Sequence, residues 1–215
     1  MKFTGSTLTI NPKDNVLVME SLYDTFDKNV VVSAPAGWSV IVYQNGKHAT
    51  NIRGGEQVKL ISRKYDKKYY TGIKFPLFGA VKLRLIFVRT SFKGTLKVDN
   101  KKIDVQGKKR ILSAYFTYQA DFKQVNPFVN FMKNLKLKPG SDGVVMTTGD
   151  FSYVIETVFP TYLLPGDSGF AIRVRTAAEK AYLQQVDSTF KNKVLQPIGW
   201  EGSNLNVSYF SIKAQ

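Results

Sequence analysis

The first half of the chain is dominated by period-two alternation of apolar and polar residues and by short β-branched runs, both typical of β-strands. These patterns predict strands at residues 16–19, 30–32, 38–43, 81–88 and 111–122. Asn45-Gly46 follows the third of these strands and predicts a type I′ hairpin turn, because both central residues of that turn need a positive φ. Asp99-Asn100 predicts a second hairpin, between residues 96 and 105.

The second half of the chain changes to helical periodicity. Asn126-Pro127 predicts a helix start, since Asn caps a helix and Pro suits its first turn, and Pro139-Gly140 predicts the end of that helix. A second helix is predicted from Asp150, and a third from the capping box Thr176-Ala177-Ala178-Glu179. Alternation over residues 205–212 predicts a final strand.

This order of elements predicts an α+β fold class, in which an N-terminal β-rich subdomain packs against a C-terminal α+β subdomain. The expected limits are an N-terminal extension with a short strand at 1–29, a basic β-rich subdomain at 30–113 and an α+β subdomain at 114–215. No Ser/Gly-rich linker marks the change near residue 113, so the two halves are expected to pack closely.

The positive charge of the chain is concentrated in one segment. The whole sequence has 31 Lys+Arg and 16 Asp+Glu, a net charge of +15, and residues 44–110 alone carry 18 basic and four acidic residues, a net charge of +14. This asymmetry predicts an anionic partner such as nucleic acid, an acidic membrane surface or an acidic protein. The alternative is a lysine-rich solvated face that keeps the sheet soluble. The candidate anion-binding residues are Arg63, Lys64, Lys67, Lys68, Lys82, Arg84, Lys101, Lys102, Lys108, Lys109 and Arg110.

Composition excludes several kinds of chemistry. The absence of cysteine excludes disulfides, thiolate zinc sites, iron–sulfur clusters and cysteine nucleophiles, and a single histidine excludes a multi-histidine metal site. Gly54-Gly55 lacks the lysine and the spacing of a phosphate-binding loop. No catalytic residue, metal ligand, cofactor or small-molecule substrate is therefore predicted. No apolar run of transmembrane length and no signal peptide is seen, so a cytoplasmic or virion location is expected.

One motif matches part of the active-site pattern of a serine protease. Gly166-Asp167-Ser168-Gly169 matches the core of the trypsin-like nucleophile motif, and His48 and Asp99 precede it in the order that a catalytic triad needs. Residue 170 is Phe where the usual pattern has a second glycine, and His48 follows a hairpin turn. A capping box also opens a helix soon after Ser168, where a two-barrel protease needs strands. The motif is therefore interpreted as a polar turn.

The strand over 111–122 carries four aromatic side chains that could stack on nucleic-acid bases: Tyr115, Phe116, Tyr118 and Phe122. Their alternation places Phe116, Tyr118 and Phe122 on one face of the strand, which is more typical of a hydrophobic core.

The order of short motifs resembles a known family. Ala36-Gly37-Trp38-Ser39-Val40-Ile41-Val42-Tyr43-Gln44-Asn45-Gly46-Lys47 with Ile52-Arg53-Gly54-Gly55 resembles the opening of SPFH (stomatin, prohibitin, flotillin, HflK/C) or band 7 domains. Phe92-Lys93-Gly94-Thr95, the aromatic strand and Val125-Asn126-Pro127-Phe128 are similar to the virion-core-like bacterial branch of that family. The end resembles it too, with Ile198-Gly199-Trp200 leading into the final strand.

The resemblance implies a non-enzymatic, two-part domain that tiles with copies of itself. The family's membrane anchor and long coiled coil have no counterpart in this sequence, so neither is implied here. We therefore expect a structural or scaffold protein that forms a homo-oligomer or larger assembly, with its basic β face toward an anionic surface, as a membrane scaffold or as a phage or viral particle component. The alternative is a nucleic-acid-binding module that uses the basic segment 44–110.

Overall fold

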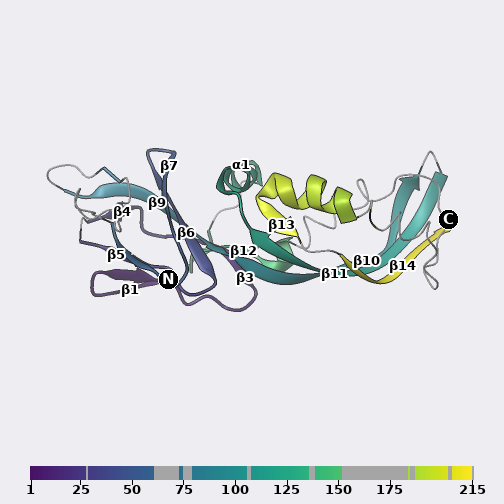
Figure 1. Ribbon diagram of the computed structural model, residues 1–215, viewed down its shortest axis with the longest axis horizontal. Helices are drawn as coiled ribbons and strands as arrows, with labels where there is room; N and C mark the ends of the chain where they lie inside the picture. The colour runs from purple at the N-terminus through teal and green to yellow at the C-terminus, as the bar shows by residue number, and fades with distance from the viewer. Residues whose placement is uncertain are drawn as a thin grey trace. The chain divides into compact units, whose positions relative to one another are not determined.

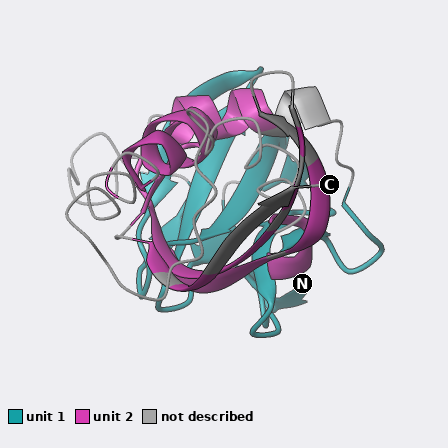
Figure 2. Cartoon of the chain, turned by 90° about the vertical axis from the view of Figure 1, so that its right-hand side faces the viewer, with its two compact units in different colours: residues 1–90, 136–147 teal, residues 91–135, 148–215 magenta. Residues whose placement is uncertain are grey.

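The computed structural model describes residues 1–27, 29–60, 73–74, 79–105, 108–135, 139–151, 184, 187–202 and 205–214 (Figure 1). These residues divide into two compact units (Figure 2). Unit 1 comprises Met1–Thr90 and Lys136–Thr147, and unit 2 comprises Ser91–Leu135 and Thr148–Gln215. Among the described residues, strands dominate, and every sheet lies wholly within one unit.

Unit 1 is built from two sheets. Its strands are β1 (Lys2–Thr4), β2 (Thr7–Thr9), β3 (Val16–Glu20), β4 (Thr25–Phe26), β5 (Val31–Ser33), β6 (Trp38–Gln44), β7 (Lys47–Ile52), β8 (Gln57–Lys59), β9 (Val81–Arg89) and β12 (Val144–Thr147). One sheet has the order β1-β2-β5-β8, and the other has the order β12-β3-β9-β6-β7, with β4 also paired to β9. Buried residues of both sheets, such as Leu8, Val32, Val40 and Phe87, form one largely aliphatic core.

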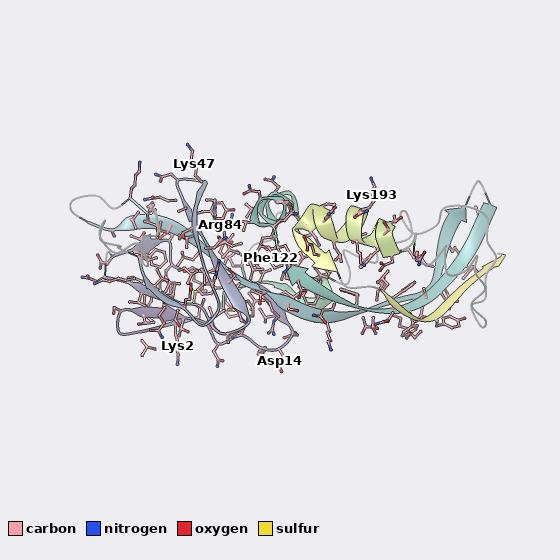
Figure 3. The ribbon with its side chains drawn as sticks, viewed as in Figure 1. Lys2, Asp14, Lys47, Arg84, Phe122 and Lys193 are labelled. Atoms are coloured by element: carbon pink, nitrogen blue, oxygen red, sulfur yellow. The ribbon has the colours of Figure 1, made fainter. Side chains whose placement is uncertain are left out.

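The sequence-predicted hairpin in unit 1 is confirmed. Strands β6 and β7 pair from Gln44 and Lys47 outward, and the turn residues Asn45 and Gly46 have φ values of 53° and 75°. Those values are the left-handed conformation that a type I′ turn requires, which Asn and Gly adopt most readily. Lys47 projects at the tip of this hairpin (Figure 3).

Strand β9 shows only part of the expected alternation. Val81, Leu83, Leu85 and Phe87 are buried on one face, as predicted. The opposite face begins with exposed Lys82, but further along the strand Ile86 and Val88 on that face are 1% and 0% exposed. The second face of β9 is therefore polar only near its start, because a central strand of a sheet can be buried on both faces.

Unit 2 is built on one long sheet. Its elements are β10 (Ser91–Val105), β11 (Lys108–Phe122), α1 (Val125–Leu135), the π-helical turn η2 (Lys191–Leu195), the 3₁₀ turn η3 (Gln196–Ile198), β13 (Trp200–Gly202) and β14 (Asn206–Ala214). Strand β11 is the centre of this sheet: β10 pairs along one side of it, and β13 and β14 pair along the other. All these pairings are antiparallel.

The predicted hairpin at Asp99-Asn100 is wrong. Strand β10 continues through both residues, and the register with β11 shifts between Val98 and Lys101, so the two residues form a β-bulge. Asn100 keeps the positive φ that its sequence context suggested, 46°, and its backbone N–H donates to the Ser113 hydroxyl over 3.0 Å. The strand returns later, because Val105 pairs with Lys108. The local turn signal of Asp99-Asn100 therefore corresponds to a kink within one long strand, and not to a turn between two strands.

An aromatic cluster forms the core of unit 2. The ring centroid of Phe92 lies 4.9 Å from those of Phe151 and Trp200, in edge-to-face geometry. Phe122 packs in the same way on Trp200 and on Phe128 of α1, at 5.5 Å and 5.3 Å. The predictions that α1 starts at Asn126-Pro127 and that the Phe116–Tyr118 face belongs to the core are confirmed.

The two units differ from the limits expected from the sequence. The chain divides after Thr90, and not near residue 113, because residue 113 lies in the middle of β11, which is paired on both sides. Residues 1–29 are not a separate extension, since β1, β2 and β3 are strands of the unit 1 sheets. Residues 139–147 also return to unit 1, where β12 pairs with β3.

The later helix predictions are covered only in part. Residues 148–151 and 187–190 are helical, and β14 confirms the predicted final strand. The capping box at 176–179 lies outside the described residues. Within the described part of the chain, no helix has both the length and the apolar character needed to cross a membrane.

Candidate anion-binding face

The structure distributes the predicted anion-binding residues over both units. Lys82 is exposed on β9 of unit 1, and Lys101, Lys102 and Lys109 are exposed on the β10–β11 hairpin of unit 2. Lys108 and Arg110 belong to β11, but the structure describes only their backbone. Four further candidates, Arg63, Lys64, Lys67 and Lys68, lie outside the described residues.

Arg84 is not an open cationic site. Its Nε and Nη2 donate to the two carboxylate oxygens of Glu20 over 2.5 Å and 2.7 Å, which is a bidentate ion pair (Arg84 is labelled in Figure 3). The hydrogen bonds to Glu20 raise the pKa of Arg84 despite partial burial, and the pair is half-buried, with side chains 39% and 16% exposed. The guanidinium charge is therefore already compensated within unit 1.

The exposed face of the unit 2 sheet brings basic, aromatic and amide side chains together. Register places Lys97, Tyr115 and Tyr209 side by side in one row across β10, β11 and β14. The next row holds Thr95, Thr117 and Asn206, and the third holds Lys93 and Gln119. We call this surface the lysine–tyrosine face; it consists of Lys93, Thr95, Lys97, Tyr115, Thr117, Gln119, Asn206 and Tyr209.

Lys97 is the best-defined cation of this face. Its Nζ lies 5.1 Å from the ring centroid of Tyr115 and 2.6 Å from Asp99 Oδ2. Hydrogen bonds to Asp99 and then to Tyr115 raise the pKa of Lys97 above its ordinary value. Because the ammonium is held over the ring, it stays charged and fixed beside the row of tyrosines.

A cavity of about 350 Å³ opens beside this row. Lys93, Thr95, Thr117, Gln119 and Asn206 line it with an ammonium, two hydroxyls and two amides. Gly94 and Tyr118 complete the lining. Most of these groups donate hydrogen bonds, so the cavity suits a ligand that is rich in acceptor oxygens.

Acidic residues mark one end of the lysine–tyrosine face. Asp121 on β11 is directly opposite Glu201 on β13, beyond the row of Lys93 and Gln119. Two carboxylates at facing positions repel an anion as well as each other. The acidic pair therefore bounds the anion-binding character of this face at the Lys93 end.

Two of the other motifs singled out in the sequence lie within the described residues. His48 Nε2 lies 2.8 Å from Asn51 Oδ1 on the exposed β7 strand, and Gly54-Gly55 forms a turn in unit 1. Ser168 lies outside the described residues, so the structure does not place it near His48 or Asp99. Among the side chains that the structure describes, no group of three or more His, Asp or Glu residues could hold a metal ion.

Sequence reasoning missed the part of the face that β14 supplies. Alternation over 205–212 predicts which side chains of that strand share a face, but it does not say which strand β14 joins. Tyr209 comes to lie beside Tyr115 only because β14 pairs with β11, which lies about 90 residues earlier in the chain. No protein-family model matches the chain, and comparison with curated proteins and with solved structures also found no match.

Proposed function

We propose that this chain is a non-enzymatic structural or scaffold protein that assembles with copies of itself by strand addition at the outer edge of β14. The observation that carries this proposal is the contrast between the two long edges of the unit 2 sheet. Strand β10 carries Lys93, Lys97, Lys101 and Lys102, whereas Lys213 is the sole charged residue in the sequence of β14. Lysines protect an edge strand from pairing with a further strand, so the β10 edge is protected and the β14 edge is not.

The outer edge of β14 is long enough to join two chains. β14 has nine residues, and within the described part of the chain it pairs with β11 alone. In an antiparallel sheet about half of the N–H and C=O groups of an edge strand point away from its neighbour, so this edge offers several backbone hydrogen bonds. By contrast, the edge strands β1 and β8 of unit 1 have only three residues each.

An SPFH-like arrangement is part of this proposal. Phe92-Lys93-Gly94-Thr95 begins the long hairpin of unit 2, Asn126-Pro127 begins α1, and Gly199-Trp200 leads into β13. These are the motifs on which the resemblance rests. With it, the proposal includes a two-part domain that tiles laterally.

The basic residues give such an assembly a surface that can bind an anionic partner. Lys101, Lys102 and Lys109 are exposed on the part of the hairpin beyond the bulge. Repeated in every copy, this cluster would present a row of positive charge toward an acidic membrane or the nucleic-acid side of a viral particle. Repetition is the physical reason why weak single contacts suffice, since linked sites bind with high avidity.

Mass photometry and sedimentation velocity across the micromolar range test the assembly. We expect the wild-type chain to form oligomers and Ser211→Lys, which places a charge on the β14 edge strand, to weaken self-association about tenfold or more. Thr117→Lys is the matched control, because it adds the same charge on the same sheet but on the central strand β11. A wild-type chain that stays monomeric, or equal loss of assembly in both variants, would contradict the proposal.

A further inference from the structure

Tyr209 is an exposed aromatic side chain at a position where packing does not require one. It is 48% exposed, and it is one of three large hydrophobic side chains of the described residues that are exposed. Its register partner on β11 is Tyr115, and directly opposite residues of neighbouring strands have Cβ atoms about 4.5–5.5 Å apart. The two tyrosines therefore occupy neighbouring positions on the sheet face, and the Lys97 ammonium lies over the Tyr115 ring on the β10 side.

The polar cavity lies next to this aromatic surface. Thr95, Thr117 and Asn206 are two positions along their strands from the tyrosine row, apart from the extra bulge residue in β14, and successive residues on one face of a strand are about 7 Å apart. Lys93 stands at the far side of the cavity, with its side chain exposed. An aromatic stacking surface and a cluster of cationic and hydroxyl donors are thus adjacent on one sheet face.

We infer that the lysine–tyrosine face binds single-stranded nucleic acid, with a base stacked on Tyr209 and a backbone phosphate in the cavity beside Lys93. Phosphate oxygens accept hydrogen bonds from lysine, threonine and amide side chains, and a base offers its flat face to a tyrosine ring. A paired base inside a duplex has no free face, so this geometry selects unpaired strands. The inference goes beyond the proposed assembly and does not depend on it, because strand addition at an edge leaves the face open.

The distribution of charge favours a nucleic acid over other anionic partners. An acidic membrane needs only a cluster of lysines, whereas this site combines one free-standing lysine with an aromatic surface and several short polar side chains. Lys97 is paired with Asp99, so its part is to hold charge beside Tyr115 rather than to bind a phosphate by itself. The facing carboxylates of Asp121 and Glu201 end the site beside Lys93, and the three rows from Lys93 to Lys97 span about 14 Å along β10.

Fluorescence anisotropy with a labelled oligothymidylate of about 12 nucleotides tests the inference at several salt concentrations. Tyr209→Ala should weaken binding roughly five-fold to a hundred-fold without changing the salt dependence, and Tyr209→Phe should retain binding, since stacking needs the ring and not the hydroxyl. Lys93→Gln should lower the slope of log affinity against log salt by about 0.7, the value for one phosphate contact on a single strand. Lys47→Gln, at an exposed lysine of unit 1 outside the candidate anion-binding residues, is the control and should change neither quantity.

Several outcomes would overturn the inference. Equal effects of Lys93→Gln and Lys47→Gln would mean that binding is diffuse and electrostatic. Equal affinity for a duplex of the same length would mean that no base is stacked. Binding to phosphatidylserine vesicles with the same dependence on Lys93 and Tyr209 would assign the site to a lipid surface. Mass photometry of the same samples separates these results from assembly, since Lys93→Gln changes a residue of β10 and should leave the oligomeric state unchanged.

Discussion

The two units solve the problem of burying a β-sheet in different ways. Unit 1 places two sheets over a core of mostly Val, Ile and Leu, whereas unit 2 covers one long sheet with an edge-to-face cluster around Trp200. The two units also differ in the kind of atom that lies closest to a tightly packed glycine. A Cβ on Gly54 of unit 1 would lie 2.7 Å from a backbone oxygen, while a Cβ on Gly94 of unit 2 would lie 2.3 Å from the Tyr118 ring.

This difference matters for function because it leaves different surfaces exposed. The short edge strands of the β1-β2-β5-β8 sheet offer little backbone for pairing. Within the described residues, the sheet of unit 2 is covered on its aromatic face, so its other face and the outer edge of β14 remain available for partners. Assembly and ligand binding are therefore both proposed for unit 2, and the predictions below test how far the units behave separately.

The largest effect is expected from Trp200→Ala. Trp200 is 0% exposed and its ring contacts Phe92, Phe122 and Phe151, so truncation should cost about 3–5 kcal/mol of unfolding free energy. Urea unfolding followed by circular dichroism measures this loss. The chain has two tryptophans, so the fluorescence of the remaining Trp38 reports unit 1 in the same experiment.

If the units have separate cores, Trp38 fluorescence should keep its wild-type midpoint while the circular dichroism transition moves to lower urea. Phe87→Ala, in the core of unit 1, is the reciprocal control and should move the Trp38 transition. Coincident shifts of both signals in both variants would show that the chain unfolds as one cooperative body and that the comparison of units has no thermodynamic meaning.

A smaller effect is expected from Gly94→Ala. The added Cβ would collide with the Tyr118 ring, which is held by Phe92 and Phe190, so overpacking should cost about 1–3 kcal/mol. Because the obstacle is a side chain, the cost should fall in a Tyr118→Leu background, which thermal unfolding of the single and double variants measures.

Gly54→Ala provides the contrast in unit 1. Its obstacles are the carbonyl oxygens of Trp38 and Pro35, at 2.7 Å and 3.0 Å from the added Cβ. Trimming a neighbouring side chain cannot remove a backbone atom, so no such rescue is expected. Equal rescue at both glycines would contradict the view that ring packing limits unit 2.

The ion pairs of the two units should also differ in how much they contribute to stability. Glu20→Gln removes the carboxylate charge from the half-buried ion pair with Arg84 and should lower the free energy of unfolding by about 1–2 kcal/mol. This loss is smaller than that expected for a fully buried pair, because the Arg84 side chain is 39% exposed. Asp99→Asn removes the partner of Lys97, where both side chains are more than half exposed, and should leave the melting temperature unchanged. A larger loss from Asp99→Asn than from Glu20→Gln would reverse this ranking.

The smallest effect concerns the charge of Lys97. Its pKa is raised by hydrogen bonds to Asp99 and Tyr115, so the folded chain holds this proton more tightly than the unfolded chain. The resulting stabilisation is fully present below the ordinary lysine pKa, about 10.4, and is lost as the pH rises through the folded value. NMR titration of the Lys97 side chain should show a lower pKa in Asp99→Asn; an unchanged value would contradict the contact.

Local signals explain why much of the fold could be predicted. The Asn45-Gly46 turn, the start of α1 at Asn126-Pro127 and the buried face of Phe116 and Tyr118 follow from turn chemistry, capping and alternation. Each of these features depends on residues that lie only a few positions apart in the sequence. The hairpin at Asp99-Asn100 failed for the same reason, since the local signal was right about the backbone of Asn100 and wrong about the path of the chain.

The candidate site could be predicted only in part. The concentration of lysines in 44–110 pointed to an anionic partner, and Tyr115 was considered as a stacking residue. The sequence could not show that Arg84 is held by Glu20, which lies 64 residues away, or that Tyr209 joins Tyr115. Long-range strand pairing decides both, and it leaves no periodic trace in either segment alone.

By itself, the sequence determined the β-rich character of the chain, its main turns and its net charge of +15, because these depend on composition and short-range periodicity. Only the tertiary structure decided which charges remain available. It paired Arg84 with Glu20 of a distant strand, and it left Lys93 beside a polar cavity next to two tyrosines. The physical reason is that the effect of a charge depends on its neighbours in space, and in a sheet those neighbours are set by register between distant strands.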